Sequence, residues 1–134
     1  MASGTTDTRP LSPHLQVWRW HATMLSSILH RTSGIINYIG AVALTVWLVL
    51  LATGSEGAVA ILTTGALSWL TTIGLIVLTW SVTYHLFNGL RHLVWDAGKG
   101  FDPQGSNLRS TIIIGGSFIP PAIIWFFALT GGAS

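Results

Sequence analysis

Three long apolar stretches separated by short polar segments dominate the pattern of this chain. They cover about residues 26–53, 60–90 and 109–131, and residues 50–57 predict a turn between the first two. A helix needs roughly 20 predominantly apolar residues, at about 1.5 Å of rise each, to cross the hydrocarbon core of a bilayer. Each stretch is long enough, so the pattern predicts an all-α integral membrane protein with three transmembrane helices.

The polar segments predict how the chain is divided. Residues 1–25 precede a three-helix transmembrane domain of residues 26–131, and residues 96–108, with Gly, Asp and Pro as helix breakers, predict a loop between the second and third helices. In the third helix, Pro120 and Pro121 remove two successive backbone donors. We therefore expect a kink near its middle.

Composition supports lipid as the solvent of this surface. Half of the residues are hydrophobic and 7% are charged, whereas about a quarter are charged in an ordinary soluble domain. The few basic residues form no dense face of the kind that binds nucleic acid, which excludes it as a partner. The chain has no cysteine, which excludes thiolate iron–sulfur ligation, cysteine zinc sites and disulfides within it.

The basic residues predict an orientation in the membrane. They flank the N-terminal side and the second loop: Arg9, Arg19, Arg31, Arg91, Lys99 and Arg109. The first loop and the C-terminus have none. The positive-inside rule places the N-terminus, residues 1–25 and the second loop in the cytoplasm and the C-terminus on the periplasmic side.

One face of the second helix carries four residues with possible chemistry: His85, Gly89, His92 and Asp96. His85 lies about 9 Å deeper than Arg91 by helical rise. A buried neutral imidazole can bind haem iron, and Gly89 leaves room for a flat macrocycle. A histidine bonded to a neighbouring helix, with Gly89 serving helix packing, is the alternative, and the residues alone leave both open.

The end of this helix has simpler interpretations. For Arg91 and His92, snorkelling onto lipid headgroups is favoured over pairing with haem propionates. For Asp96, pairing with Arg91 or Lys99 is favoured over supplying protons to a quinone.

Ser27, His30 and Arg31 share one face of the first helix. A hydroxyl and a guanidinium one turn apart can hydrogen-bond a quinone carbonyl and stabilise the negative charge of reduction. The alternative, favoured by the residues alone, is a helix N-cap at Ser27 and an orientation anchor at Arg31. Because His30 adjoins Arg31 at the interface and His85 lies deeper, we expect the two histidines not to share one iron. A second ligand to a haem at His85 then comes from another chain.

Two polar-rich signatures carry a resemblance. They are RPLSPHL at residues 9–15 with SILHRTSG at 27–34, and HLFNGLRHLVWD at 85–96. Here the sequence resembles the succinate dehydrogenase cytochrome b subunit family, whose members anchor that enzyme to the membrane. The resemblance covers about residues 9–34 and 84–98.

The resemblance implies roles for particular residues. His85 is expected to be an axial ligand to a haem b shared with a companion anchor subunit. His30, Arg31 and His92 are expected near the haem propionates, and Ser27 and Arg31 in the ubiquinone pocket.

The resemblance also implies partners and a location. A second membrane-anchor subunit, an iron–sulfur subunit and a flavoprotein that oxidises succinate are expected, with electrons reaching ubiquinone at the cytoplasmic side of a bacterial inner membrane. The alternatives are an anchor of a fumarate reductase, a haem-free anchor, or a small transporter subunit with a polar pathway at His85 and Arg91. A transporter more often shows an internal repeat, and none is visible here.

Overall fold

The computed structural model describes residue 10 and residues 14–131. These residues form five helices and no strand: α1 (Ala22–Ala52), α2 (Glu56–Thr63), α3 (Ser68–Asp96), α4 (Pro103–Gly116) and α5 (Ile119–Gly131). Three segments of the described chain are long and apolar enough to cross a membrane: Ala22–Ala52, Ser68–Asp96 and Pro103–Gly131. The predicted all-helical fold with three spans is therefore confirmed.

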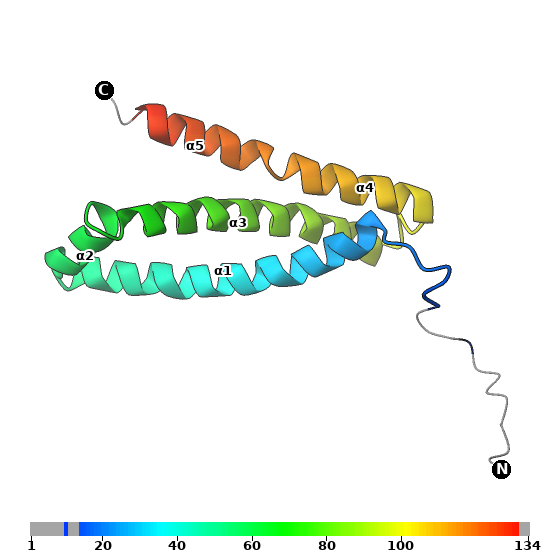
Figure 1. Ribbon diagram of the computed structural model, residues 1–134, viewed down its shortest axis with the longest axis horizontal. Coiled ribbons are helices and arrows are strands. Elements are labelled where there is room, and N and C mark those ends of the chain that lie inside the picture. Colours follow the sequence, from blue (N-terminus) through cyan, green and yellow to red (C-terminus); the bar gives the residue numbers. More distant parts are fainter. Residues whose placement is uncertain (1–9, 11–13, 132–134) are drawn as a thin grey trace, which may run out of the picture.

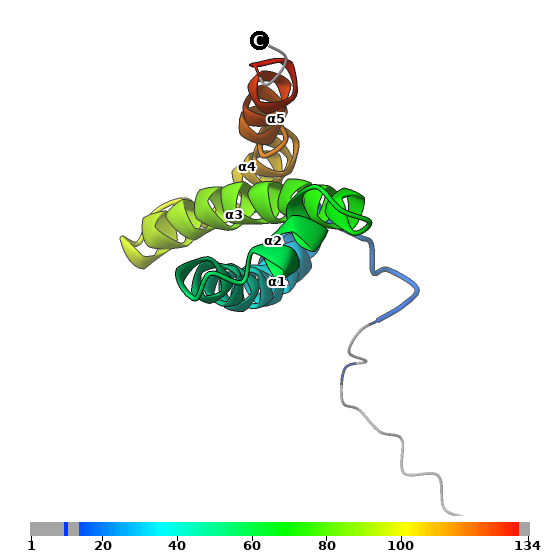
Figure 2. The ribbon, with the colours of Figure 1, turned by 90° about the vertical axis from the view of Figure 1, so that its left-hand side faces the viewer.

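The helix α3 lies at the centre of the molecule. Figure 1 shows α1 and α3 running antiparallel, with α2 at the end where they join. Figure 2, turned by 90°, shows α3 between α1 on one side and α4 and α5 on the other. The start of α1 also reaches α4, because the Ala22 backbone N–H donates to Asn107 Oδ1 at 2.8 Å. The start of α1, the end of α3 and the start of α4 therefore share one end.

The second apolar stretch is divided, which its hydropathy did not predict. Gly54 turns the chain after α1 with a φ of 70°, a conformation that glycine adopts without strain. The short α2 then ends before Gly65, where an added Cβ would lie 2.8 Å from the backbone of Ile61. This close approach requires glycine, and the second long helix begins only at Ser68.

The loop after α3 is shorter than the expected residues 96–108, because Asp102 starts α4. Its carboxylate accepts a hydrogen bond from the Gly105 backbone N–H at 2.7 Å, and Pro103 occupies the first turn, where its missing donor costs nothing. The Arg109 guanidinium donates to the same carboxylate at 2.8 Å. This hydrogen bond, together with the one from Gly105, holds the pKa of Asp102 below its ordinary value.

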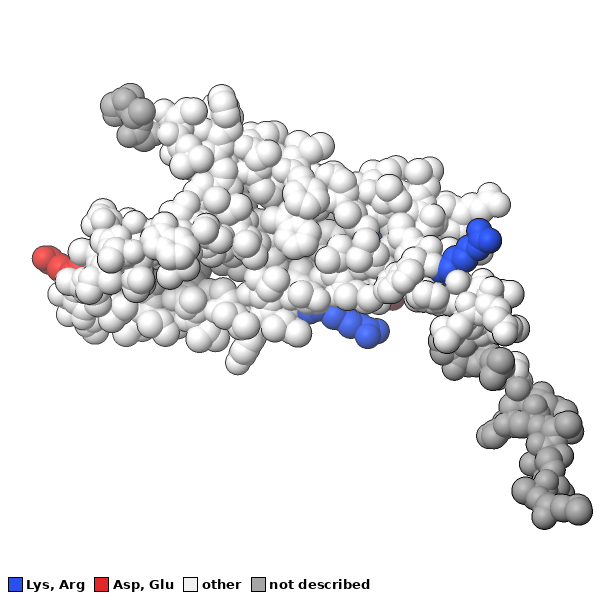
Figure 3. Space-filling model, viewed as in Figure 1, with Lys and Arg blue, Asp and Glu red and all other residues white. Residues whose placement is uncertain are grey.

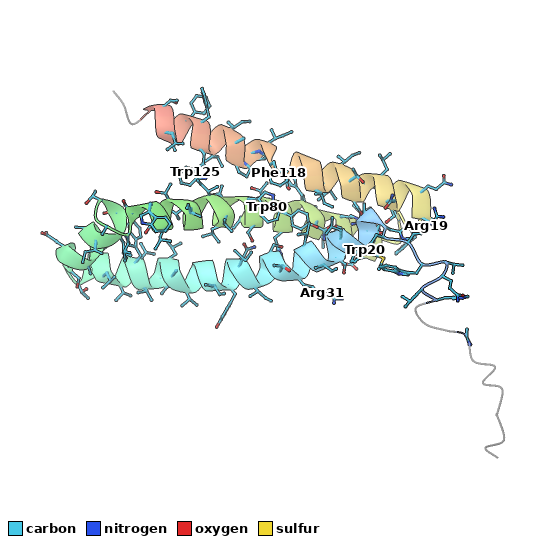
Figure 4. All side chains as sticks on the ribbon, in the orientation of Figure 1. Arg19, Trp20, Arg31, Trp80, Phe118 and Trp125 are labelled. Atoms are coloured by element: carbon cyan, nitrogen blue, oxygen red, sulfur yellow. The ribbon has the colours of Figure 1, made fainter. Side chains whose placement is uncertain are left out.

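The third span is interrupted as predicted. The helices α4 and α5 are separated at Ser117 and Phe118, just before Pro120 and Pro121 (Figure 1). The Ser117 hydroxyl donates to the Ile114 carbonyl at 2.7 Å and accepts from Trp80 Nε1 at 3.1 Å. The interruption is thus fixed against α3, where Trp80 and Phe118 stack (Figure 4).

The interior of the described chain is polar and its surface is apolar. Tyr84 is the one fully buried hydrophobic residue there, while five serines are less than 2% exposed: Ser26, Ser33, Ser81, Ser110 and Ser117. Leucine, isoleucine and valine side chains cover the outside. Helices associate in lipid through small and hydrogen-bonding residues, because lipid tails solvate apolar side chains equally well. The buried polar residues between α1 and α3 form one polar seam: Ser26, Ser33, Ser81, Tyr84, Asn88 and Arg91.

Candidate functional site

A buried arginine connects three helices at the end where the basic residues gather (Figure 3). Arg91 on α3 is 6% exposed. Its Nη1 donates to Ser26 Oγ on α1 at 3.1 Å and to Asn88 Oδ1 at 3.3 Å, and its Nη2 donates to Ser106 Oγ on α4 at 3.0 Å. The expectation that Arg91 snorkels to lipid headgroups is wrong, because oxygens from α1 and α4 receive its donors inside the protein.

Further hydrogen bonds complete this cluster. The Tyr84 hydroxyl donates to the Ser26 carbonyl at 2.7 Å, and the Ser26 hydroxyl donates to Asn88 Oδ1 at 2.8 Å. The guanidinium carbon of Arg91 lies 4.1 Å from the centre of the Trp95 ring, a cation–π contact. Neutral oxygens and an aromatic face thus surround the positive charge.

No carboxylate in the described part of the chain pairs with Arg91. Asp96 is exposed and forms an ion pair with neither Arg91 nor Lys99. The predicted pairing of Asp96 is therefore wrong. The guanidinium of Arg91 is turned inward and donates to Ser26 and Ser106 instead.

Three histidines meet beside this cluster. The rings of His30 and His85 stack with centroids 4.0 Å apart and planes 14° from parallel. The ring centroid of His92 lies 5.0 Å from that of His30. The expected difference in depth between His30 and His85 is wrong. The helix α1 begins at Ala22, so His30 lies about two turns inside it, at the level of His85.

The two stacked rings present their faces to each other. A shared iron needs one nitrogen aimed at it from each side, so this arrangement gives no common metal position. Among the described residues, no group of three or more His, Cys, Asp or Glu side chains could hold a metal ion.

The two ring nitrogens of His85 have different surroundings. Nδ1 lies 3.1 Å from the hydroxyl of Ser33 on α1, whereas Nε2 has no hydrogen-bond partner within residues 14–131. Beside it, the Nδ1 atom of His30 is buried and has no hydrogen-bond partner among these residues. At Gly89, one turn beyond His85, no atom lies within 4 Å of an added Cβ. The space that a flat group needs there is open.

Ser27 and Arg31 lie one turn apart on the outside of α1. Both are exposed, and neither side chain hydrogen-bonds within the described chain. Arg31 projects away from α3 (Figure 4). The N-cap of α1 is His21, so the alternative interpretation of Ser27 as a helix cap is wrong. Their donors face outward, where another molecule can reach them.

The inward-facing polar residues were not among the predicted site residues: Ser26, Ser33, Ser81, Tyr84, Asn88 and Ser106. Their spacing offered a signal. Ser26 and Ser33 are seven residues apart, and Ser81, Tyr84 and Asn88 follow at intervals of three and four, which places each set on one helix face. Polar residues at membrane depth rarely lack a partner.

Comparison with known proteins decides the family. Residues 5–124 match the family described as succinate dehydrogenase/fumarate reductase transmembrane subunit. The chain belongs to this family. The match includes α1, α2, α3, α4 and part of α5, and therefore the whole seam.

Bacterial and mitochondrial proteins are similar to this chain in sequence. It is 42% identical over 122 residues to the succinate dehydrogenase cytochrome b556 subunit of Paracoccus denitrificans, covering 89% of this chain and 91% of that protein. It is 31% identical over 117 residues to the subunit of the same name from Rickettsia prowazekii, covering 87% and 90%. The mitochondrial succinate dehydrogenase cytochrome b560 subunit of Mus musculus is 39% identical over 98 residues, 72% of this chain and 57% of that one.

Proposed function

We propose that this chain is the membrane-anchor cytochrome b subunit of a bacterial succinate dehydrogenase in the inner membrane. The names of its relatives support this assignment, as do its three apolar spans. The chain would bind haem b and contribute to the site where ubiquinone is reduced. Succinate oxidation itself belongs to other subunits of such a complex.

The observation that carries the haem proposal is the environment of His85. One ring nitrogen is held by Ser33 at 3.1 Å, and the other has no partner among the described residues. A histidine that ligates a metal commonly has this arrangement, with its second nitrogen bonded to a protein oxygen. The open space at Gly89 fits a macrocycle on the same face of α3. The residues present therefore fit a haem bound through His85.

When bound, a b-type haem supplies a one-electron carrier. The companion anchor subunit would supply the other protein ligand to the haem iron, since the stacked ring of His30 presents its face to His85. His30, Arg31 and His92 are proposed to lie near the propionates. The Nδ1 atom of His30 and the guanidinium of Arg31, which have no hydrogen-bond partner in the described part of the chain, are suited to such acidic groups.

Ser27 and Arg31 are proposed to bind ubiquinone. A hydroxyl and a guanidinium on one helix face can both donate to a quinone carbonyl oxygen, and the fixed positive charge stabilises the negative charge that forms there on reduction. Both are exposed and have no hydrogen-bond partner among the described residues, which suits a pocket shared with other subunits. The proposed partners are a second membrane-anchor subunit, an iron–sulfur subunit and a flavoprotein.

The proposed orientation places the end with Ser27 and Arg31 toward the cytoplasm. Arg19, Lys99 and Arg109 lie in segments at that end of the molecule, and Glu56 begins α2 at the opposite end. This agrees with the positive-inside rule. Electrons from succinate would then enter the membrane from its cytoplasmic side.

Purification of the complex through a tag on this chain tests the proposal. A flavoprotein, an iron–sulfur protein, a second small membrane protein and haem b should copurify, with succinate:ubiquinone reductase activity. A complex without haem would support a haem-free anchor. A complex that reduces fumarate much faster than it oxidises succinate would support a fumarate reductase. Isolation of the chain alone would favour a transporter subunit.

A further inference from the structure

The buried hydroxyl of Ser33 contacts the ring of His85, the proposed haem ligand. Ser33 on α1 is 1% exposed, and its Oγ lies 3.1 Å from His85 Nδ1 and 2.9 Å from the His30 carbonyl oxygen. It is the one side chain in residues 14–131 that hydrogen-bonds the His85 ring.

The hydrogen atoms of this contact can be assigned from chemistry. A carbonyl oxygen only accepts, so the single hydroxyl hydrogen of Ser33 is donated to the His30 carbonyl. The oxygen then approaches His85 Nδ1 as an acceptor, which requires a hydrogen on Nδ1. A neutral imidazole carries one ring hydrogen, and Nε2 is left with its lone pair free.

The position of Ser33 is itself fixed. Its backbone carbonyl oxygen lies 3.0 Å from Ser81 Oγ, which also lies 2.7 Å from Asn37 Oδ1, so these two acceptors share the one hydroxyl hydrogen of Ser81. Next in sequence, Gly34 lies against the His85 ring, because an added Cβ would be 3.3 Å from Cε1. The acceptor and the ring are therefore held together by contacts on both helices.

We propose that Ser33 is a positioning residue that orients His85 and selects the tautomer whose Nε2 can bind iron. This inference rests on the proposed haem-binding function of His85. A hydrogen bond from Nδ1 also makes the imidazole a stronger electron donor. Its loss should therefore favour the reduced iron and shift the haem midpoint potential to a more positive value.

The experiment compares variants in the assembled, purified complex. In Ser33→Ala we expect a positive shift of the haem midpoint potential, changed g-values of the oxidised low-spin haem, and haem affinity weakened by about 10- to 100-fold. Ser110→Ala is the matched control, since this hydroxyl is equally buried but donates only to the Ser106 carbonyl. Ser33→Thr keeps the hydroxyl and should keep the wild-type potential.

A further variant keeps the test possible if Ser33→Ala fails to assemble. If Ser33→Ala does not assemble, Ser33→Cys fills the same space with a weakly hydrogen-bonding sulfur and should shift the potential in the same direction. The inference is overturned if Ser33→Ala or Ser33→Cys matches Ser110→Ala, or if Ser33→Thr shifts the potential as far as Ser33→Ala.

His85→Leu separates this inference from the proposed function. If His85→Leu removes the haem signal while Ser33→Ala behaves as the control, only the role of Ser33 is wrong. If His85→Leu leaves the haem unchanged, His85 is not a ligand, and the inference about Ser33 is overturned with it.

Discussion

The guanidinium of Arg91 donates a hydrogen bond at 3.1 Å to the hydroxyl of Ser26, which precedes it by 65 residues. The same guanidinium reaches Ser106 on α4 at 3.0 Å. One buried side chain thus fixes α1, α3 and α4 at the end of the bundle that carries the proposed ubiquinone site. The charge of Arg91 serves the assembly of the helices rather than an interaction with headgroups.

Replacement of Arg91 should weaken the bundle. Arg91→Leu removes the donors to Ser26 and Ser106, and hydrogen bonds to a charged group each contribute about 1.5–3 kcal/mol. We expect a markedly lower yield and melting temperature of the purified complex. Lys99→Leu removes the same charge from an exposed position near this end and should change neither. Equal behaviour of the two variants would show that the Arg91 hydrogen bonds contribute little.

Ser27 and Arg31 should affect quinone reduction specifically. Ser27→Ala removes one hydrogen bond, worth about 0.5–1.5 kcal/mol or up to roughly tenfold in rate. Arg31→Leu should lower the rate further, because it also removes the charge that stabilises reduced quinone. The measurement is the ratio of ubiquinone-linked activity to succinate oxidation by an artificial acceptor that takes electrons upstream.

A control and the haem content accompany this measurement. Thr45→Ala changes another exposed hydroxyl of α1, which donates only to the Ala41 carbonyl, and should leave the ratio unchanged. Haem content is measured in each preparation, because Arg31 is also proposed to lie near a propionate. An unchanged ratio in both Ser27→Ala and Arg31→Leu would show that neither residue lines the quinone pocket.

Hydropathy predicted the three spans because their length and apolarity are set by the bilayer. The same apolarity made the inward faces of the helices hard to identify from hydropathy. Ser26 and Ser27 are adjacent in sequence, yet Ser26 is buried in the Arg91 cluster and Ser27 is exposed. Lipid accepts apolar residues on every outward position, so no hydrophobic stripe distinguishes the two serines. Packing against α3 decides which one turns inward, and the seven-residue spacing from Ser26 to Ser33 is the signal of it in the sequence.

The sequence pattern also did not predict how deep His30 lies in the membrane. His30 was placed at the membrane interface because it adjoins Arg31, whereas α1 begins at Ala22, so both residues lie about two turns inside the helix. Interfacial residues such as Trp18 and Trp20 blur the end of a span, because aromatic side chains favour headgroup depth. The short helix α2 was missed for a different reason. Gly65 ends it through close backbone packing, which has no hydropathy signal.

The orientation predicts where a C-terminal reporter works. The basic residues place the end shared by α1, α3 and α4 in the cytoplasm, and three spans then carry the C-terminus across. A reporter active only in the periplasm, fused after Ser134, should be active, and one active only in the cytoplasm should be silent. The reverse pattern would contradict the orientation.

The reduced-minus-oxidised absorption spectrum of the complex with His85→Leu tests the central claim most directly. Leucine is readily accommodated in lipid, so the helix should insert, and the b-type haem signal should be lost or severely changed. His30→Leu is the matched control, since it alters the neighbouring stacked ring, and should have the smaller effect on iron coordination. A wild-type spectrum in His85→Leu, or loss of the low-spin signal in His30→Leu alone, would contradict haem ligation by His85.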